Sequence, residues 1–298
     1  MKQILARIKP YLRWFILGGV LFFLVKTIKE RWSEIAAVSI DSQGGLILAI
    51  ALLITIIAHL WSGWVWTWIL GLFQQPLGGL EGIRVYLLTN IAKYSPGNIW
   101  HFYGRISAVT HKGGSRGVAT LSVLLEPLLM AAAALLVGLI ASGWSETSPN
   151  WRGLQLCSLL IVLVGIHPQI LNALLHRLSK SKADAVEVVK LTQYPLLPFL
   201  GEIGFVMLRG IGFILTFMAL QTIAWEKIPQ LFTAFSFAWL LGLVVPGAPG
   251  GLGVFEVTAY SLLNDSLFPA EIAAIALYRL ISILAEAIAA LAVLKVNN

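Results

Sequence analysis

Charged residues and cysteines are scarce in this 298-residue sequence. Only 12% of the residues are charged, whereas 58% are hydrophobic. Because an ordinary soluble domain carries about 25% charged residues, this composition excludes that class and indicates a polytopic membrane protein. Cys157 is the only cysteine, which excludes an intramolecular disulfide and argues against a thiolate metal site.

Recognisable enzyme motifs are lacking as well. The sequence contains neither a phosphate-binding Walker motif nor a dinucleotide fingerprint. Its five histidines do not show metal-ligand spacing. We therefore expect a protein that is not an enzyme and uses neither a cofactor nor a metal.

The basic residues point to membrane topology rather than to nucleic acid. The net charge is +7, but most of the basic residues fall in short loops between apolar runs. Four basic residues, the last of them Arg13, lie at the N-terminus, which predicts that this end is in the cytoplasm. We expect an integral protein of a bacterial inner (plasma) membrane, with both termini in the cytoplasm and no nucleic-acid partner.

Hydrophobic runs predict an all-α membrane protein with about six full spans. The chain is expected to form a single transmembrane domain, residues 1–298, without a separate soluble domain. The longest polar connection is predicted at about residues 169–194. The expected spans cover about residues 11–27, 46–72, 118–142, 153–168, 196–222 and 270–294.

Two apolar regions are broken by proline and glycine. One runs from Lys93 to Arg105 around Pro96-Gly97, and the other from Pro246 to Glu256 around Pro249-Gly250. Proline blocks a helix interior and glycine frees the backbone, so neither region can form one continuous helix. Broken backbone is tolerated at membrane depth only where protein or a wet cavity covers it. The pattern predicts two re-entrant hairpins, the second with residues 228–245 as its descending arm.

The two breaks fit an inverted repeat. When Pro96 is set over Pro249, the residues at the first, second and seventh places are identical. The number of residues from the break to the start of the next span is also about the same in both halves. We expect one half at about residues 11–142 and the other at about 153–294. With three full spans per half, the second half enters the membrane upside down, as in many secondary transporters.

Ionisable residues inside the spans need partners. A charged side chain at the centre of a span costs roughly 2.5–3.5 kcal/mol on insertion scales. We predict that Glu126 pairs with Arg105 and that Glu256 pairs with Arg279, near the hairpin tips. These pairs would belong to a binding site, or they would only hold the spans together. His59 is interpreted as a hydrogen-bonded residue at a helix contact.

The hairpin tips are the predicted substrate site. Helix N-termini after Gly97 and Gly250 offer free N–H groups to an anion, and Lys93, His101 and Arg105 suit a phosphate head group. Glu256 would hold an amine or a coupling proton. Alternatively, the glycines only allow close helix packing. The substrate-binding candidates are Lys93, Pro96, Gly97, Asn98, Trp100, His101, Arg105, Glu126, Pro249, Gly250, Gly251, Gly253, Glu256 and Arg279.

Three motifs give a family resemblance: the segment 93–105, Leu124-Leu-Glu-Pro127, and the segment 245–256, together with Arg279 in the last span. At these residues the chain resembles the transmembrane region of lysylphosphatidylglycerol synthases, also called the UPF0104 family of membrane proteins. In those synthases this region acts as a flippase, while a separate cytosolic domain attaches the amino acid. That domain is missing here, so the resemblance implies lipid movement without lysyl transfer.

Three functions are compatible with these features. The first is a lipid translocase for an anionic or zwitterionic lipid or a lipid-linked precursor. The second is an accessory subunit of polyprenyl-linked glycan or lipid synthesis, which binds the lipid without moving it. The third is an ion-coupled carrier for a small solute. Expected partners are a membrane lipid or lipid-linked substrate, another copy of the chain, or an enzyme of lipid or glycan synthesis.

Overall fold

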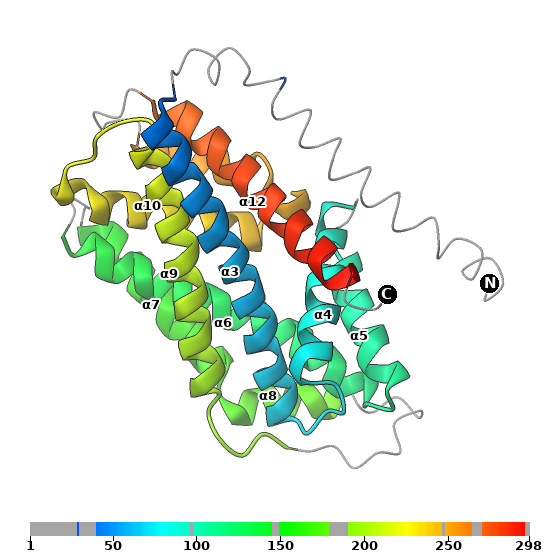
Figure 1. The fold of residues 1–298 in the computed structure, drawn as a ribbon. Helices are drawn as coiled ribbons and strands as arrows, with labels where there is room; N and C mark the ends of the chain where they lie inside the picture. The colour runs from blue at the N-terminus through cyan, green and yellow to red at the C-terminus, as the bar shows by residue number, and fades with distance from the viewer. Residues whose placement is uncertain are drawn as a thin grey trace.

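The computed structural model describes Lys29 and residues 40–95, 98–144, 149–178, 190–245, 248–263 and 270–295, which form an assembly of helices (Figure 1). The span predicted at about 11–27 lies outside the described residues. The helices are α3 Ser42–Leu72, α4 Gly79–Asn90, α5 Trp100–His111, α6 Arg116–Ser142, α7 Pro149–Gly165, α8 Pro168–Leu178, α9 Leu196–Met218, α10 Ile228–Val244, α11 Val254–Leu263 and α12 Glu271–Lys295, with 3₁₀ turns η1 Ile91–Tyr94, η2 Trp225–Lys227 and η3 Pro249–Gly251.

The long apolar helices agree with most of the predicted spans. Within the described residues, five helices are long and apolar enough to cross a membrane, and the bent pair α7 and α8 would make a sixth. Helices α3, α6, α9 and α12 begin and end within about four residues of the spans predicted for them. The prediction of a polytopic all-α membrane protein is therefore confirmed.

Two segments differ from the sequence prediction. The connection expected from about residue 169 contains α8, which follows α7 after a bend of 57°. The bend lies at Pro168, which cannot continue the ladder of α7, and the buried leucines Leu171 and Leu175, one turn apart, give α8 an apolar face. The expected hairpin arm 228–245 also differs, because the helical stretch Trp225–Val244 is itself long enough to cross a membrane.

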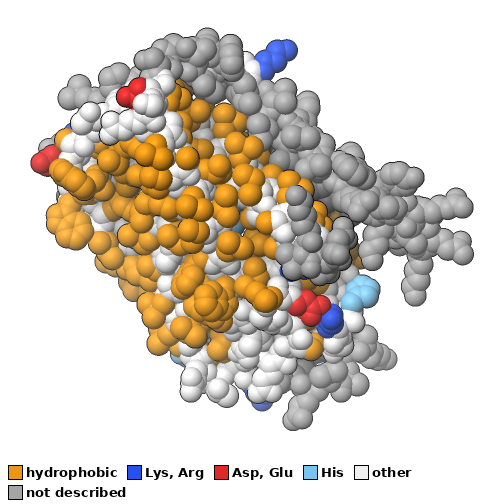
Figure 2. All heavy atoms as spheres, in the orientation of Figure 1, with side chains coloured by type: hydrophobic (Ala, Val, Ile, Leu, Met, Phe, Trp, Pro, Cys, Tyr) orange, Lys and Arg blue, Asp and Glu red, His pale blue; other side chains and the backbone are white. Residues whose placement is uncertain are grey.

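Helix α3 shows why these helices suit lipid. Apolar side chains at spacings of three and four residues remain exposed along one face, namely Leu46, Ile50, Leu53, Ile57, Leu60 and Trp64. The opposite face is buried and includes Ala51, Ala58, Val65 and Trp66. A helix that is apolar all round has no face for water, so the exposed stripe is expected to contact lipid chains. Figure 2 shows apolar side chains covering much of one side of the molecule.

Helices α3 and α9 form the central pair. They lie side by side and run in opposite directions, and α6 and α12 contact both (Figure 1). The close approach depends on Gly201, where a Cβ would lie 2.6 Å from Val65 Cγ2. The indole N–H of Trp61 donates to the Gly201 carbonyl over 2.7 Å. Small residues and interhelical hydrogen bonds are the usual means of joining helices in membranes.

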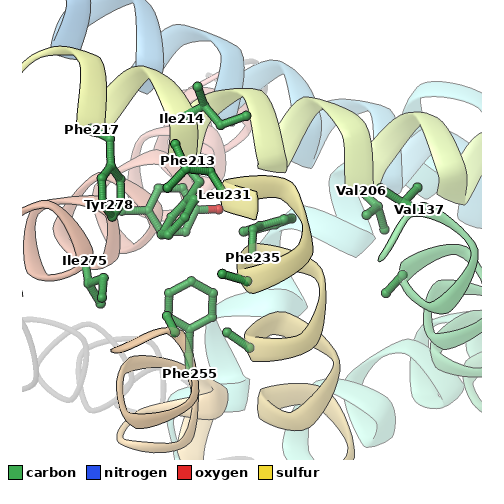
Figure 3. Close-up of a cluster of buried hydrophobic side chains, with 14 of the residues drawn as sticks. Val137, Val206, Phe213, Ile214, Phe217, Leu231, Phe235, Phe255, Ile275 and Tyr278 are labelled. Atoms are coloured by element: carbon green, nitrogen blue, oxygen red, sulfur yellow. The ribbon is translucent and has the colours of Figure 1, made fainter. Parts of the chain in front are cut away.

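An aromatic cluster joins the C-terminal helices. Phe213 of α9, Phe235 of α10, Phe255 of α11 and Tyr278 of α12 converge in one buried group (Figure 3). The Phe213 and Tyr278 rings meet edge to face with centroids 5.1 Å apart. Such packing contributes about 0.5–1.5 kcal/mol per pair beyond area burial. The short helix α11 is thereby held against three longer helices.

Candidate functional site

The two broken segments meet inside the bundle. Tyr94, at the end of η1, is 3% exposed and lies directly against Gly250 of η3. A Cβ on Gly250 would lie 2.5 Å from Cε1 of the Tyr94 ring. The described residues on either side of the two breaks therefore lie close together. Pro96 and Gly97, at the centre of the first break, lie outside the described residues.

Backbone conformation at the breaks requires particular residues. Asn98 has a φ of +49°, a conformation that asparagine tolerates better than most other residues. Gly250 and Gly251 have φ values of +60° and +74°, in the left-handed region where glycine pays no Cβ penalty. Gly251 also packs against the backbone of Gly242, where a Cβ would lie 3.0 Å from Cα. The second break is therefore a tight packing of main chain on main chain.

A polar pocket of about 300 Å³ lies where the segments meet. Its walls come from α3, α4, α5, α6, α9, α10, α11 and α12 and from the two 3₁₀ turns η1 and η3. The ionisable side chains that line it are His59, Tyr86, Lys93, Tyr94, His101, Arg105, Glu126, Arg209, Arg279 and Glu286. The apolar part of the wall includes Phe102, Leu124, Met130, Phe205, Trp239, Leu243 and Phe255. A cavity of this size suits a small ligand or the head group of a larger one.

The predicted pair of Arg105 and Glu126 is present. Arg105 Nη1 contacts Glu126 Oε2, and the two side chains are 2% and 3% exposed. The Arg105 guanidinium also lies over the Tyr86 ring, 3.8 Å from its centroid. Because both charges are buried, each requires the other, and removal of one partner leaves an uncompensated charge.

The predicted pair of Glu256 and Arg279 is present as well. Arg279 Nε lies 2.8 Å from Glu256 Oε1. Its Nη2 donates to the carbonyl of Gly250 over 2.9 Å, and the other carboxylate oxygen of Glu256 accepts the N–H of Gly253 over 2.7 Å. Glu256 therefore caps the first turn of α11 while it holds Arg279 against the second break.

A third set of charges connects four elements. Lys93 Nζ of η1 donates to Glu286 Oε1 of α12 over 2.7 Å. His59 Nε2 of α3 lies 3.4 Å from the same oxygen and 3.2 Å from Arg209 Nη1 of α9. His59, Arg209 and Glu286 are each less than 5% exposed. We call these four residues the charge network.

The structure places most of the predicted binding residues at the pocket. Lys93, Asn98, His101, Arg105, Glu126, Gly250, Gly251 and Arg279 line it. The remaining described candidates do not. Trp100 is 49% exposed and contacts Tyr103, and Glu256 lies behind Arg279, where it holds that side chain in position. Gly253 belongs to the second break but does not line the cavity.

Sequence reasoning missed part of the wall. His59 is a hydrogen-bonded residue at the contact of α3 with α9, as interpreted, but its place at the pocket beside Glu286 was not expected. Arg209 and Glu286 lie within predicted spans, and the sequence alone indicates only that such charges need partners. The available signal was an ionisable side chain within each of three apolar spans, which in membranes indicates a functional position by default. The spacing of residues along one helix could not show that these three side chains, which come from different helices, would contact one another.

Several polar atoms at the pocket have no hydrogen-bond partner within the described part of the chain. They include Asn98 Oδ1, His101 Nδ1, Arg209 Nε and Glu286 Oε2. Buried polar atoms are normally satisfied, so the unpaired atoms of these lining residues need an explanation, and a bound ligand is one. Among the described residues, no group of three or more His, Cys, Asp or Glu side chains is placed to hold a metal ion.

Comparisons with known proteins do not assign this chain to a family. No model of a known protein family matches the sequence, and no curated protein matches it significantly. The resemblance of its motifs to the synthase transmembrane region stays a prediction. A functional conclusion must therefore be drawn from the geometry of the pocket.

Proposed function

We propose that this protein is an integral membrane lipid translocase of the flippase type, acting on an anionic or zwitterionic lipid or a lipid-linked precursor. One observation carries the proposal: a cavity of about 300 Å³ lined by four cationic side chains lies inside a bundle with an apolar exterior. Charges at membrane depth are costly and are retained where they serve a substrate path. A charged head group needs such a path, whereas acyl chains can stay in the surrounding lipid.

The proposal includes an inverted repeat, which pairs of pocket residues support. In each pair the two positions differ by 153, as 86 and 239 do, and both members line the cavity. The pairs are Tyr86 with Trp239, Asn90 with Leu243, Asn98 with Gly251, Phe102 with Phe255, and Glu126 with Arg279. Setting Gly97 over Gly250 requires the same offset. Helix contacts repeat in the same way, since α6 contacts α10 and α12 contacts α4.

We further propose that the two broken segments are re-entrant hairpins. Helices α4 and α5 have 12 residues each, and a helix of that length extends about 18 Å, well short of a hydrocarbon core of about 30 Å. Helix α11 has only 10 residues. Helix α10 is longer, so the second hairpin would be asymmetric, with one full-length arm. The antiparallel course of α3 and α9 agrees with halves of opposite orientation.

The cellular setting follows from the charge pattern of the sequence. We place the protein in a bacterial inner membrane with both termini in the cytoplasm, because basic residues concentrate at the ends of the apolar segments predicted to face inward. Cysteines introduced at Gly78 and Gly143, which lie in connections at opposite ends of spans, should then differ in labelling by a membrane-impermeant reagent in intact cells. Equal labelling at both positions would contradict this topology.

Translocation is tested in reconstituted liposomes. Purified protein is inserted into vesicles that contain fluorescent phospholipids or a fluorescent polyprenyl phosphate, and an impermeant quencher then reports how much probe reaches the outer leaflet. We expect protein-dependent movement of at least one negatively charged probe, and loss of that movement in Arg279→Gln. Binding of the same probes without movement would support the accessory-subunit reading instead.

A second candidate function rests on Glu202 of α9. This carboxyl is 0% exposed, and neither of its oxygens has a hydrogen-bond partner among the described residues. A buried acid without a partner is typical of proton or cation sites in ion-coupled carriers. Solute uptake that is driven by a pH gradient and abolished in Glu202→Gln, in vesicles that do not move lipid, would favour that function.

A further inference from the structure

The charge network contains more positive than negative charge. Arg209 and Lys93 are cations, and Glu286 is the only carboxylate in the network. Arg105 and Arg279 have their own carboxylates, Glu126 and Glu256. Among the described residues, Arg209 has no carboxylate within ion-pairing distance of its guanidinium. One positive charge therefore remains without its own counter-ion at the pocket.

His59 does not supply the missing negative charge. His59 Nε2 lies 3.2 Å from Arg209 Nη1, and because arginine can only donate hydrogen bonds, the imidazole can serve this contact only as an acceptor, which carries no negative charge. Arg209 is 4% exposed, and its Nε has no hydrogen-bond partner among the described residues. The guanidinium also lies over the Tyr278 ring, 5.3 Å from its centroid, and a guanidinium without a carboxylate partner retains donors for an anion, which it can bind with two parallel hydrogen bonds.

We propose that Lys93, His59, Arg209 and Glu286 form a binding subsite for a phosphate group. Lys93 and Arg209 contact the phosphate oxygens, His59 holds the guanidinium in place, and Glu286 limits the net charge of the subsite to about one. This inference rests on the proposed translocase and names where its head group binds. The subsite lies on α3, α9, α12 and η1, away from the helix N-terminus after the first break, where the sequence alone placed the phosphate.

The charge balance of the subsite predicts that two substitutions change the affinity for an anion in opposite directions. If the four residues bind an anion, Arg209→Gln and Glu286→Gln must change affinity in opposite directions, because one removes the unpaired cation and the other removes the competing carboxylate. If the four residues only hold the helices together, both substitutions loosen the site and both weaken binding. Glu286→Gln preserves the shape of the side chain and Arg209→Gln keeps a neutral polar group, so the sign of the effect on affinity separates the two roles.

The experiment is a calorimetric titration of the full chain in non-ionic detergent at low ionic strength, where screening is weakest. The probes are dihexanoyl phosphatidate, dihexanoyl phosphatidylcholine and inorganic phosphate. For phosphatidate we expect Arg209→Gln to weaken binding about tenfold or more, the factor that one charged hydrogen bond contributes. Glu286→Gln should bind it more tightly than the unaltered chain does. Arg116→Gln, an exposed residue outside the pocket, should change nothing.

A further variant and a second probe ensure that the proposal can be refuted even if Arg209→Gln does not fold. Lys93 is 22% exposed, so Lys93→Gln should fold even if Arg209→Gln does not, and it must also weaken phosphatidate binding. Tight binding of inorganic phosphate with the same variant pattern supports the subsite and identifies free phosphate as its ligand. Weakening in both Arg209→Gln and Glu286→Gln, or no binding of any anion by the unaltered chain, overturns the proposal.

Failure of the subsite and failure of the translocase give different results. If liposomes show lipid movement that Arg209→Gln leaves unchanged, the translocase stands and the subsite is wrong. If the predicted affinity changes are observed but vesicles show no movement of any probe, the subsite stands and translocation is wrong. Vesicle and titration assays on the same variants therefore decide the two questions separately.

Discussion

Adding one methyl group at Gly250 tests whether the two breaks are in contact as the structure shows. Alanine at this position must adopt a φ of +60°, and its Cβ would lie 2.5, 2.9 and 3.2 Å from three atoms of the Tyr94 ring. The ring cannot easily move away, because Tyr94 is 3% exposed and packs with Ile283, Leu252 and Ile91.

The expected cost has two parts. A left-handed conformation costs a non-glycine residue about 1–2 kcal/mol, and forcing a methyl group into a filled site costs about 1–3 kcal/mol. Gly250→Ala should therefore lower the free energy of unfolding by roughly 2–5 kcal/mol. Gly79 has a similar φ of +57°, but a Cβ there would meet nothing within 4 Å. Gly79→Ala isolates the backbone cost alone.

The assay is equilibrium unfolding in mixed micelles, followed by tryptophan fluorescence. Gly250→Ala should be about 1–3 kcal/mol less stable than Gly79→Ala, the part that comes from the ring. In a Tyr94→Ala background, the cost of Gly250→Ala should fall to that of Gly79→Ala, because the contact no longer exists. Equal destabilisation by the two alanines in the unaltered background would refute the contact.

Two further comparisons test the buried charges and the helix contacts by the same unfolding assay. Arg105→Gln leaves buried Glu126 without its cation and should cost about 3–5 kcal/mol, whereas Lys112→Gln breaks a pair with Glu81 that is 51% exposed on both sides and should cost less than about 1 kcal/mol. Similar losses in both variants would contradict the assigned burial. Gly201→Ala should cost about 1–3 kcal/mol, because its Cβ would meet Val65 at 2.6 Å. Gly153→Ala, in open space on α7, should gain about 0.5–1 kcal/mol, and a loss there would show that α7 packs more tightly than described.

Much of the fold could be predicted because hydrocarbon imposes a simple rule on the sequence. Long apolar runs with few charges become spans, and α3, α6, α9 and α12 follow from that rule. Helix α8 could not be found in this way, because hydropathy over a long window averages its apolar face with the polar residues between. Helix α10 was predicted to be one arm of a hairpin because it ends at a Pro/Gly break. The length of the apolar stretch before that break, which is enough to cross a membrane, was not considered.

The pocket could be predicted only in part, since sequence distance does not report spatial distance. Opposite charges near two breaks suggested the pairs of Arg105 with Glu126 and of Arg279 with Glu256, and both are present. The charge network escaped because its members come from four elements, with 193 residues between Lys93 and Glu286. No local pattern connects them. Only the packing of α3 against α9 and α12 brings His59 to Glu286.

In the proposed repeat, the two breaks differ in chemistry in a way that a common site requires. The first contributes side chains, since Lys93, Asn98 and His101 face the cavity, whereas the second contributes space through Gly250 and Gly251. The position that corresponds to Tyr94 at the offset of 153 is Gly247, so the second break has no aromatic side chain to match the ring that packs against Gly250. Because the two halves differ in sequence, Tyr94 of the first break can pack against Gly250 of the second break. The polar side chains of the first break then line the shared cavity. A repeat with identical halves would also bring like charges together, whereas Glu126 and Arg279 occupy equivalent places with opposite sign.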